Sequence, residues 1–253
     1  MRILERDRIG GLAKGLRVIE AFTAEKTRLT ITEAAAAAKL DRATARRCLL
    51  TLADLGYCDY DGKFFSVTPR ILRLGAACLA SMPLPRIVQP LIDKLSQEIG
   101  ESTSVSVLDE TEIVYIARAA QTRVMSISLM PGSRLPAYCT SMGRVLLSAL
   151  DPGKARDVLL SSALEARTAH TQIDPDRLME EIAMVRRQGH AAIDQEVEIG
   201  LRSVAVPMLN GRGQTIAALN AGFAVRQETM ADAVQRLLPS LMRTRDQIRS
   251  LLT

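Results

Sequence analysis

The chain has 253 residues, 47% of them hydrophobic and 24% charged, which excludes disordered and fibrous classes and allows one large folded domain or two modest ones. No apolar run approaches the roughly 20 residues that a membrane helix needs, and the first eight residues are too charged for a secretory signal. We therefore expect a cytoplasmic protein with no membrane association. The 4 cysteines are far apart and only 2 histidines are present, so we expect no disulfide framework, no metal site and no cofactor.

The net charge of +5 is confined to the first third of the chain. Residues 1–80 contain 14 Lys and Arg against 9 Asp and Glu, whereas residues 81–253 hold 19 of each. A basic module joined to a neutral one suggests that the first part faces a polyanion. On charge alone, a solvated basic surface is an equally good explanation.

The first 40 residues predict two helices. The first covers about residues 11–24, because one apolar stripe recurs at helical spacing: Leu12, Leu16, Ile19 and Phe22. The second opens at a capping box, in which Thr30 accepts from the Glu33 amide and Glu33 reaches back. It continues through the alanine-rich residues 33–39.

A third helix is predicted from Asp41, a good N-cap, to about residue 55. Its spacing gives an apolar face with Ala45, Cys48, Leu49, Leu52 and Leu55. The opposite face carries Ala43, Arg46, Arg47 and Leu50. Two short helices joined by a tight turn, the second presenting arginines near its start, form a helix-turn-helix that fits a major groove.

Residues 57–60 and 63–67 flank a two-residue Asp61-Gly62 turn and predict a hairpin, which would form a wing beside the third helix. The whole segment therefore indicates a winged helix-turn-helix that binds double-stranded DNA. Arg46 and Arg47 are the candidates for base edges or phosphates. The remaining DNA-facing candidates are Ala43 beside them, Arg42 and Thr44 on phosphates, and Lys63 at the wing tip.

Thr68-Pro69 is typical of a helix start, and the prolines among residues 82–85 would stop that helix. We therefore expect a DNA-binding domain over residues 1–68, a linker helix over 69–83 and a second domain over 84–253. In the second domain the sequence pattern predicts helices at 87–100, 138–150, 151–160, 175–188 and 229–251. It predicts strands at 102–108, 112–119, 124–130, 190–194, 201–209 and 214–223. The expected fold class is α+β, with helices on a mainly antiparallel sheet.

The chain resembles the IclR family of bacterial transcription regulators over nearly its whole length. The segments that carry this resemblance are residues 11–19 (GLAKGLRVI), the winged helix, residues 194–207 and residues 214–222. Residues 135–147 (LPAYCTSMGRVLL) are closer still to the subgroup that controls β-ketoadipate pathway genes, which degrade aromatic acids. The resemblance implies an effector domain similar to GAF folds and a homodimer or tetramer. It also implies control of operator binding by a small organic acid, aromatic or dicarboxylic.

By matching motifs, the resemblance implies an effector pocket lined by residues 134–142 and by Asp194, Glu196, Glu198, Ser203 and Asn220. A pocket that binds an organic acid needs apolar walls and a few hydrogen-bond donors. The expected walls are Met130, Leu135, Tyr138 and Met142, and the expected donors are Ser203, Asn220, helix-start amides and Arg134. The acidic residues would repel an anion, so we expect them to hold the loop or to pair with an arginine such as Arg202.

An enzyme in the second domain is the alternative, with Cys139 as nucleophile and His190 as base. A helix start can lower a thiol pKa. However, the sequence offers no oriented triad, nucleophile elbow or phosphate loop. We therefore expect no catalytic residues and a DNA-binding regulator rather than an enzyme.

Overall fold

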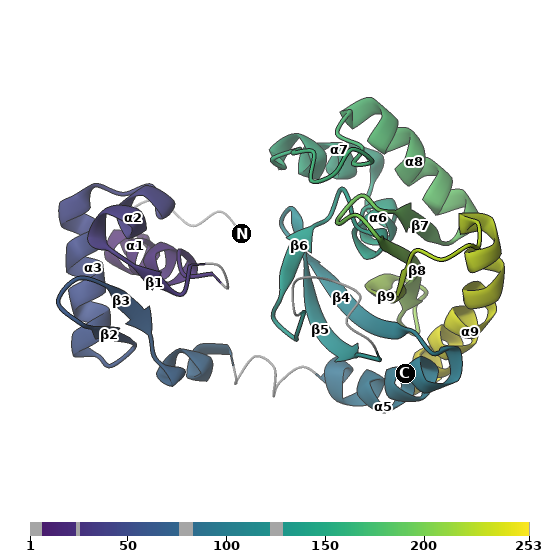
Figure 1. Ribbon diagram of the computed structural model, residues 1–253, viewed down its shortest axis with the longest axis horizontal. Helices are drawn as coiled ribbons and strands as arrows, with labels where there is room; N and C mark the ends of the chain where they lie inside the picture. The colour runs from purple at the N-terminus through teal and green to yellow at the C-terminus, as the bar shows by residue number, and fades with distance from the viewer. Residues whose placement is uncertain (1–6, 24–25, 76–82, 122–128, 253) are drawn as a thin grey trace. The chain divides into compact units, whose positions relative to one another are not determined.

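A computed structural model describes residues 7–23, 26–75, 83–121 and 129–252. The chain divides into two compact units, residues 1–81 and residues 82–253, whose elements are labelled in Figure 1. No helix in the described ranges is both long and apolar enough to cross a membrane.

The N-terminal unit packs three helices against a small sheet: α1 (Gly10–Glu20), α2 (Ile31–Ala37) and α3 (Arg42–Asp54). The predicted caps are present. Thr30 and Glu33 form the capping box of α2, and the Asp41 side chain accepts from the Thr44 amide at the start of α3. Both caps satisfy amides that have no partner within their helix.

The wing is a three-stranded antiparallel sheet in the order β1-β3-β2. It contains β1 (Arg28–Leu29), which was not predicted, and the predicted hairpin of β2 (Cys58–Tyr60) and β3 (Phe65–Val67). The Asp-Gly turn was predicted too short, since the strands are joined by residues 61–64. Asp61 Oδ1 accepts from the Lys63 and Phe64 amides there, which holds the loop closed.

Two apolar predictions fail in this unit. Leu12 and Leu16 are 62% and 46% exposed, so the first part of the α1 stripe does not face the core, where Val18 is fully buried. Leu55 is also 50% exposed, because it lies at the C-cap of α3 rather than within its buried face.

Thr68 caps the short 3-10 helix η2 (Pro69–Ile71), and helical structure continues over residues 72–75. The rest of the predicted linker helix lies outside the described residues. α5 (Pro83–Ile99) begins four residues earlier than predicted. Its prolines at 83 and 85 fall in the first turn, where a missing amide costs nothing.

The C-terminal unit is built on a six-stranded antiparallel sheet in the order β6-β5-β4-β9-β8-β7. Its strands are β4 (Ser102–Asp109), β5 (Glu112–Ala119), β6 (Arg134–Pro136), β7 (Ala191–Asp194), β8 (Leu201–Leu209) and β9 (Thr215–Ala224). Helices cover both faces of this sheet (Figure 1). The predicted α+β class is therefore confirmed.

Alternating side chains divide the sheet between two cores. Val204, Val206 and Leu219 face α5 and α9 (Met230–Leu251). Ala205 and Ala218 face α6 (Ser141–Ser148) and α8 (Pro175–Gln188). α7 (Pro152–Ser161) packs beside these last two helices.

Besides α5, and α1, which ends four residues before the predicted residue 24, most of the predicted strands and helices match within one or two residues, with three further exceptions. Most of the strand expected over residues 124–130 lies outside the described residues, and Leu129 and Met130 belong to no strand. β6 was not predicted. α6 begins three residues later than expected, because residues 138–140 stay outside the helix and Thr140 caps it.

Candidate functional site

α3 presents a cationic face to solvent. Arg42, Arg46 and Arg47 are exposed, and among the described residues no carboxylate lies within ion-pair distance of them. Ala43, also exposed, lies between them. Arginines that are free of acidic partners can donate to guanine edges or phosphates without first breaking an ion pair.

Thr44 departs from the prediction that it faces phosphates. Its side chain is on the buried side of α3, with the residue 7% exposed, and its Oγ1 accepts from Arg47 Nη2 at 3.4 Å. Thr44 therefore orients the helix start and one arginine, and does not itself present a free hydroxyl.

The wing tip adds a further cation. Lys63 is exposed and its Nζ lies 5.0 Å from the centroid of the Phe64 ring. Arg28 lies over the same ring at 4.8 Å and forms an ion pair with Asp61. Of the two, Lys63 is the side chain left available for a phosphate.

The C-terminal unit contains a small cavity on the α6 face of its sheet, and this cavity is partly open to solvent. Apolar side chains form much of its wall, as is usual for a small-molecule site. The described residues that line it are Ser102, Ser104, Tyr115, Arg118, Leu129, Leu135, Thr140, Ser141, Met142, Val197, Leu201, Ser203, Asn220 and Gly222.

The floor of the cavity is a polar row across three strands. Ser104 on β4 pairs with Arg118 on β5 and with Asn220 on β9, so the three residues lie side by side in register. The β4–β5 ladder shifts register after Val105, which leaves Ile116 without a partner. This bulge brings Tyr115 and Arg118 to the same face although they are three residues apart.

Arg118 is the charged residue among the described residues that line the cavity. Its Nη1 donates to Ser104 Oγ at 3.1 Å, and no carboxylate of the described chain lies within ion-pair distance of it. Burial lowers the pKa of its guanidinium, which nevertheless stays charged at neutral pH. Arg118 was not predicted, because simple alternation along β5 places it opposite Tyr115.

Two buried polar atoms that border the cavity have no hydrogen-bond partner within the described structure: Ser141 Oγ and Asn220 Oδ1. The two residues are only 1% and 8% exposed. An unsatisfied buried polar group costs about 1–3 kcal/mol. A ligand that hydrogen-bonds both groups would remove this cost.

The structure brings together only part of the predicted pocket. Leu135, Met142, Ser203 and Asn220 line the cavity, as do Thr140 and Ser141 of the predicted segment 134–142. The other residues named for the pocket do not line it, which corrects the prediction: Met130, Arg134, Tyr138, Asp194, Glu196 and Glu198.

Three of these residues lie elsewhere in the unit. Met130 is 60% exposed. Arg134 binds Asp109 and Glu112 at 2.8 and 2.6 Å on the surface. Tyr138 is buried, and its hydroxyl donates to the Glu165 carbonyl at 2.6 Å.

The acidic residues hold the loop that follows β7, as their repulsion of an anion suggested. Asp194 pairs with Arg202 at 2.8 Å, and hydrogen bonding from Arg202 lowers its pKa. Glu196 binds Arg144 at 2.7 Å within the unit. Burial raises the pKa of Glu196, although Arg144 opposes this shift.

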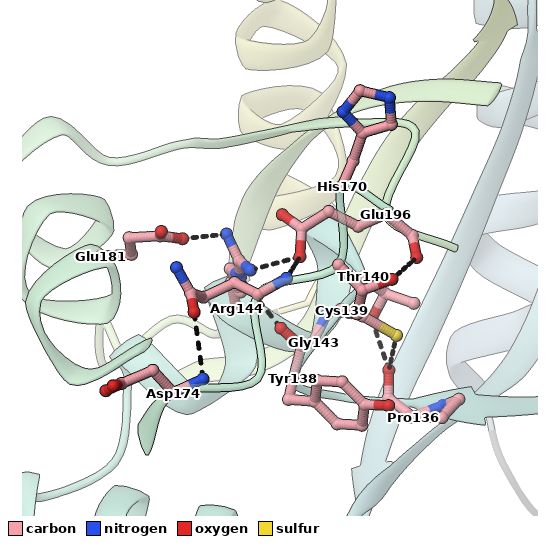
Figure 2. A network of polar contacts seen from close by, with 12 residues as sticks. Pro136, Tyr138, Cys139, Thr140, Gly143, Arg144, His170, Asp174, Glu181 and Glu196 are labelled. Atoms are coloured by element: carbon pink, nitrogen blue, oxygen red, sulfur yellow. Dashed lines mark hydrogen bonds and ion pairs between the residues drawn. The ribbon is translucent and has the colours of Figure 1, made fainter. Parts of the chain in front are cut away.

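Arg144 ties three elements together in Figure 2. It lies on α6, donates from Nε to the Tyr138 carbonyl at 2.9 Å, and pairs with Glu181 of α8 and Glu196 of the loop. The neighbouring Val197 lines the cavity. This network of ion pairs and hydrogen bonds therefore fixes the position of the loop that contributes Val197 to the cavity wall.

The geometry contradicts a nucleophilic Cys139. Its side chain is fully buried and does not line the cavity. Burial raises its pKa to about 11, opposite in sign to the lowering that a helix start was expected to give. The His190 ring, the proposed base, instead lies near the Gln188 carbonyl at 3.3 Å.

A cationic winged helix on one unit and a polar-floored cavity in the other define a DNA-binding protein with a separate small-molecule domain. A family model described as "IclR helix-turn-helix domain" matches residues 11–62. A second, "Bacterial transcriptional regulator IclR C-terminal", matches residues 76–250. The chain belongs to the IclR family of bacterial transcription regulators, and is not an enzyme.

Similar proteins span almost the whole chain. The Pca regulon regulatory protein of Pseudomonas putida is 45% identical over 93% of this chain and 81% of its own length. The p-hydroxybenzoate hydroxylase transcriptional activator of Acinetobacter baylyi is 36% identical over 98% and 94%. The inducer-binding domain of an Acinetobacter PobR double mutant in complex with 3-hydroxy benzoic acid is 34% identical, covers 66% of this chain and 98% of that one, and superposes with a TM-score of 0.62.

Proposed function

We propose that this chain regulates genes of aromatic-compound catabolism, and that an aromatic acid bound in the cavity of the C-terminal unit changes its binding to an operator. The observation that carries the proposal is Arg118, a cation with no acidic partner among the described residues, inside a cavity with apolar walls. Such a site favours an organic anion. The relatives named for the Pca regulon and for p-hydroxybenzoate hydroxylase support the same class.

The DNA-binding part of the proposal assigns the contacts to α3 and the wing, with the protein acting in the cytoplasm. Arg46 and Arg47 read base edges, Arg42 and Lys63 bind phosphates, and Ala43 packs against the groove. A homodimer would place two such helices in successive major grooves of a pseudo-palindromic operator. The exposed leucines of α1, Leu12 and Leu16, support an interface with a second copy.

The test is binding of the purified protein to DNA from upstream of its own gene. The titration is run across a salt series, with and without 3,4-dihydroxybenzoate, 4-hydroxybenzoate and β-ketoadipate. We expect specific binding with a steep salt slope, because contacts to phosphates release counterions, and an affinity that one acid changes. Specific binding that no acid alters would refute the proposed class of effector, but it would still support sequence-specific binding to DNA.

A further inference from the structure

We propose that Leu50 of α3 determines part of the operator sequence by contacting the C5-methyl group of a thymine in the major groove. This inference rests on the proposed function, because that function takes α3 as the helix that enters the groove. It adds an apolar base contact to the hydrogen bonds that the proposed function assigns to Arg46 and Arg47.

Leu50 lies on the same side of α3 as the two arginines. Residues three, four and seven positions apart line one face of a helix. The residues that follow this spacing, all of them exposed, are Ala43, Arg46, Arg47 and Leu50. The opposite side of the helix is buried in the N-terminal unit, through Thr44, Ala45, Leu49 and Leu52. Leu50 therefore belongs to the cationic face that meets solvent.

The core of the N-terminal unit does not account for Leu50. The residue is 37% exposed, and it is not among the described hydrophobic residues that pack against the buried cluster of the unit. Its helix neighbours Cys48 and Ala53 do pack there. A single exposed leucine is ordinary on a protein surface, so its meaning comes from its surroundings.

The surroundings of Leu50 are cationic. Arg46 and Arg47 lie one turn before it, and no carboxylate of the described residues lies within ion-pair distance of either. A partner that covers Leu50 must also neutralise these charges, because burying them unpaired is costly. B-DNA does both: its phosphates attract the arginines, and the C5-methyl group of thymine is an apolar group exposed in the major groove.

The helix geometry relates this thymine to the arginine contacts. For a helix that lies along the groove, Leu50 is about 4.5–6 Å beyond Arg47 and Arg46 on the axis. Base pairs are about 3.4 Å apart, so we expect the thymine one or two base pairs from a base that these arginines contact. One turn further, phosphates would repel the exposed Asp54. Leu50 is therefore the last residue of this face that we expect to reach a base.

The experiment replaces thymines of the operator one at a time by deoxyuridine, which lacks the C5-methyl group and keeps the base pairing. The operator is the footprint of the full-length protein on DNA from upstream of its own gene, and fluorescence anisotropy measures the affinity. We expect one thymine in each half-site at which loss of the methyl group weakens binding roughly three- to five-fold, as for one buried methyl group.

Variants of Leu50 test whether this residue makes the contact. In Leu50→Ala the affinities for the thymine and deoxyuridine operators become equal, because the side chain no longer reaches the methyl group. Leu50→Met, which keeps an apolar side chain of similar length, retains the difference. The matched control is Leu55→Ala, at a 50% exposed leucine on the C-cap of α3 and outside this face, which also retains the difference. A merely structural role of Leu50 would lower both affinities by the same factor.

The outcomes distinguish this inference from the proposed function. A methyl effect that is equal in Leu50→Ala and in the wild type overturns the inference, and so does a footprint without any methyl-sensitive thymine. Both results leave the proposed function standing, because specific binding through the arginines does not depend on this contact. A wild-type protein without specific binding overturns both. Loss of the methyl effect in Leu50→Ala, but not in Leu55→Ala, supports the inference.

Discussion

Gly143 lies where α6 passes closest to the preceding segment. A Cβ at this position would be 2.1 Å from the Ala137 carbonyl oxygen and 2.4 Å from its Cα, and both are backbone atoms that cannot rotate away. We expect Gly143→Ala to destabilise the C-terminal unit by about 1–3 kcal/mol, the usual cost of overpacking. Denaturant unfolding monitored by circular dichroism measures this change.

The matched control is Gly222→Ala in β9 of the same unit. A Cβ there meets nothing within 4 Å, so the midpoint of unfolding should move little. Equal losses of stability in the two variants would contradict the close-packing argument, because they would reflect a general sensitivity of glycines in this unit.

The cysteines should differ in reactivity according to their burial. Burial raises the pKa of Cys139 and of Cys58 to about 11, so at pH 8 both thiols stay protonated and only a small fraction is the reactive thiolate. Cys48 is only partly buried. Among Cys48, Cys58 and Cys139 in the native protein, we expect iodoacetamide to label Cys48 first, and Cys139 only after unfolding or as the pH approaches 11.

Peptide mass spectrometry over a time course measures the order of labelling, with a urea-unfolded sample as the control in which the order is lost. Rapid labelling of Cys139 at pH 7 would contradict the buried, neutral thiol. It would also restore interest in this residue as a nucleophile.

At the level of elements, α3 and the wing should contribute to DNA binding in different ways. We expect Arg46→Ala or Arg47→Ala to cost about 1–3 kcal/mol on the specific operator and to relax base preference, if the arginine grips a base edge with two hydrogen bonds. Lys63→Ala should weaken binding to all sequences and reduce the salt slope by about one unit.

Fluorescence anisotropy with operator and scrambled DNA distinguishes these effects. Arg187→Ala is the control, since it removes one exposed positive charge from α8 in the other unit. An unchanged operator affinity in an Arg46→Ala/Arg47→Ala double variant would refute the assignment of α3 as the reading helix.

The sequence predicted those elements whose signals are local. The bounds of α8 match because Asp174, Pro175 and Gly189 mark its ends, and β8 matches because its apolar run is bounded by turns. The winged helix was recognised from its caps and its Asp-Gly hairpin. In contrast, β1 and β6 are too short for a periodic pattern, and they exist because neighbouring strands pair with them.

The candidate site depended on features that are not local. Leu135, Met142, Ser203 and Asn220 were found through the family resemblance, and all four line the cavity. Arg118 was not found, because only the β-bulge at Ile116 turns it toward Tyr115's face. Arg134 was chosen instead, although the surface carboxylates that neutralise it become neighbours only when β6 pairs with β5.

At the level of the whole molecule, the proposed function assigns recognition of DNA to one unit and recognition of an acid to the other. A bound acid can alter operator binding only if it binds DNA-competent and incompetent states with different affinities. Val197 and Met142 link the cavity wall to the loop and to α6, and Arg144 joins these two elements through Glu196. This network is where ligand contact would first change the packing of the C-terminal unit.

The proposed homodimer gives the last prediction. The exposed face of α1 carries Leu12 and Leu16, and an isolated apolar stripe of this kind favours contact with a second copy over exposure to water. We expect Leu12→Glu/Leu16→Glu to shift the protein toward monomer in sedimentation velocity, because two like-charged pairs would have to be buried in a two-fold interface.

The same double variant should lose affinity for a full operator much more than for a half-site, since only the full operator needs two helices at once. Leu160→Glu, at an exposed leucine of α7 in the other unit, is the control and should leave the oligomeric state unchanged. A variant that stays fully dimeric and keeps its preference for the full operator would exclude the α1 face as the interface.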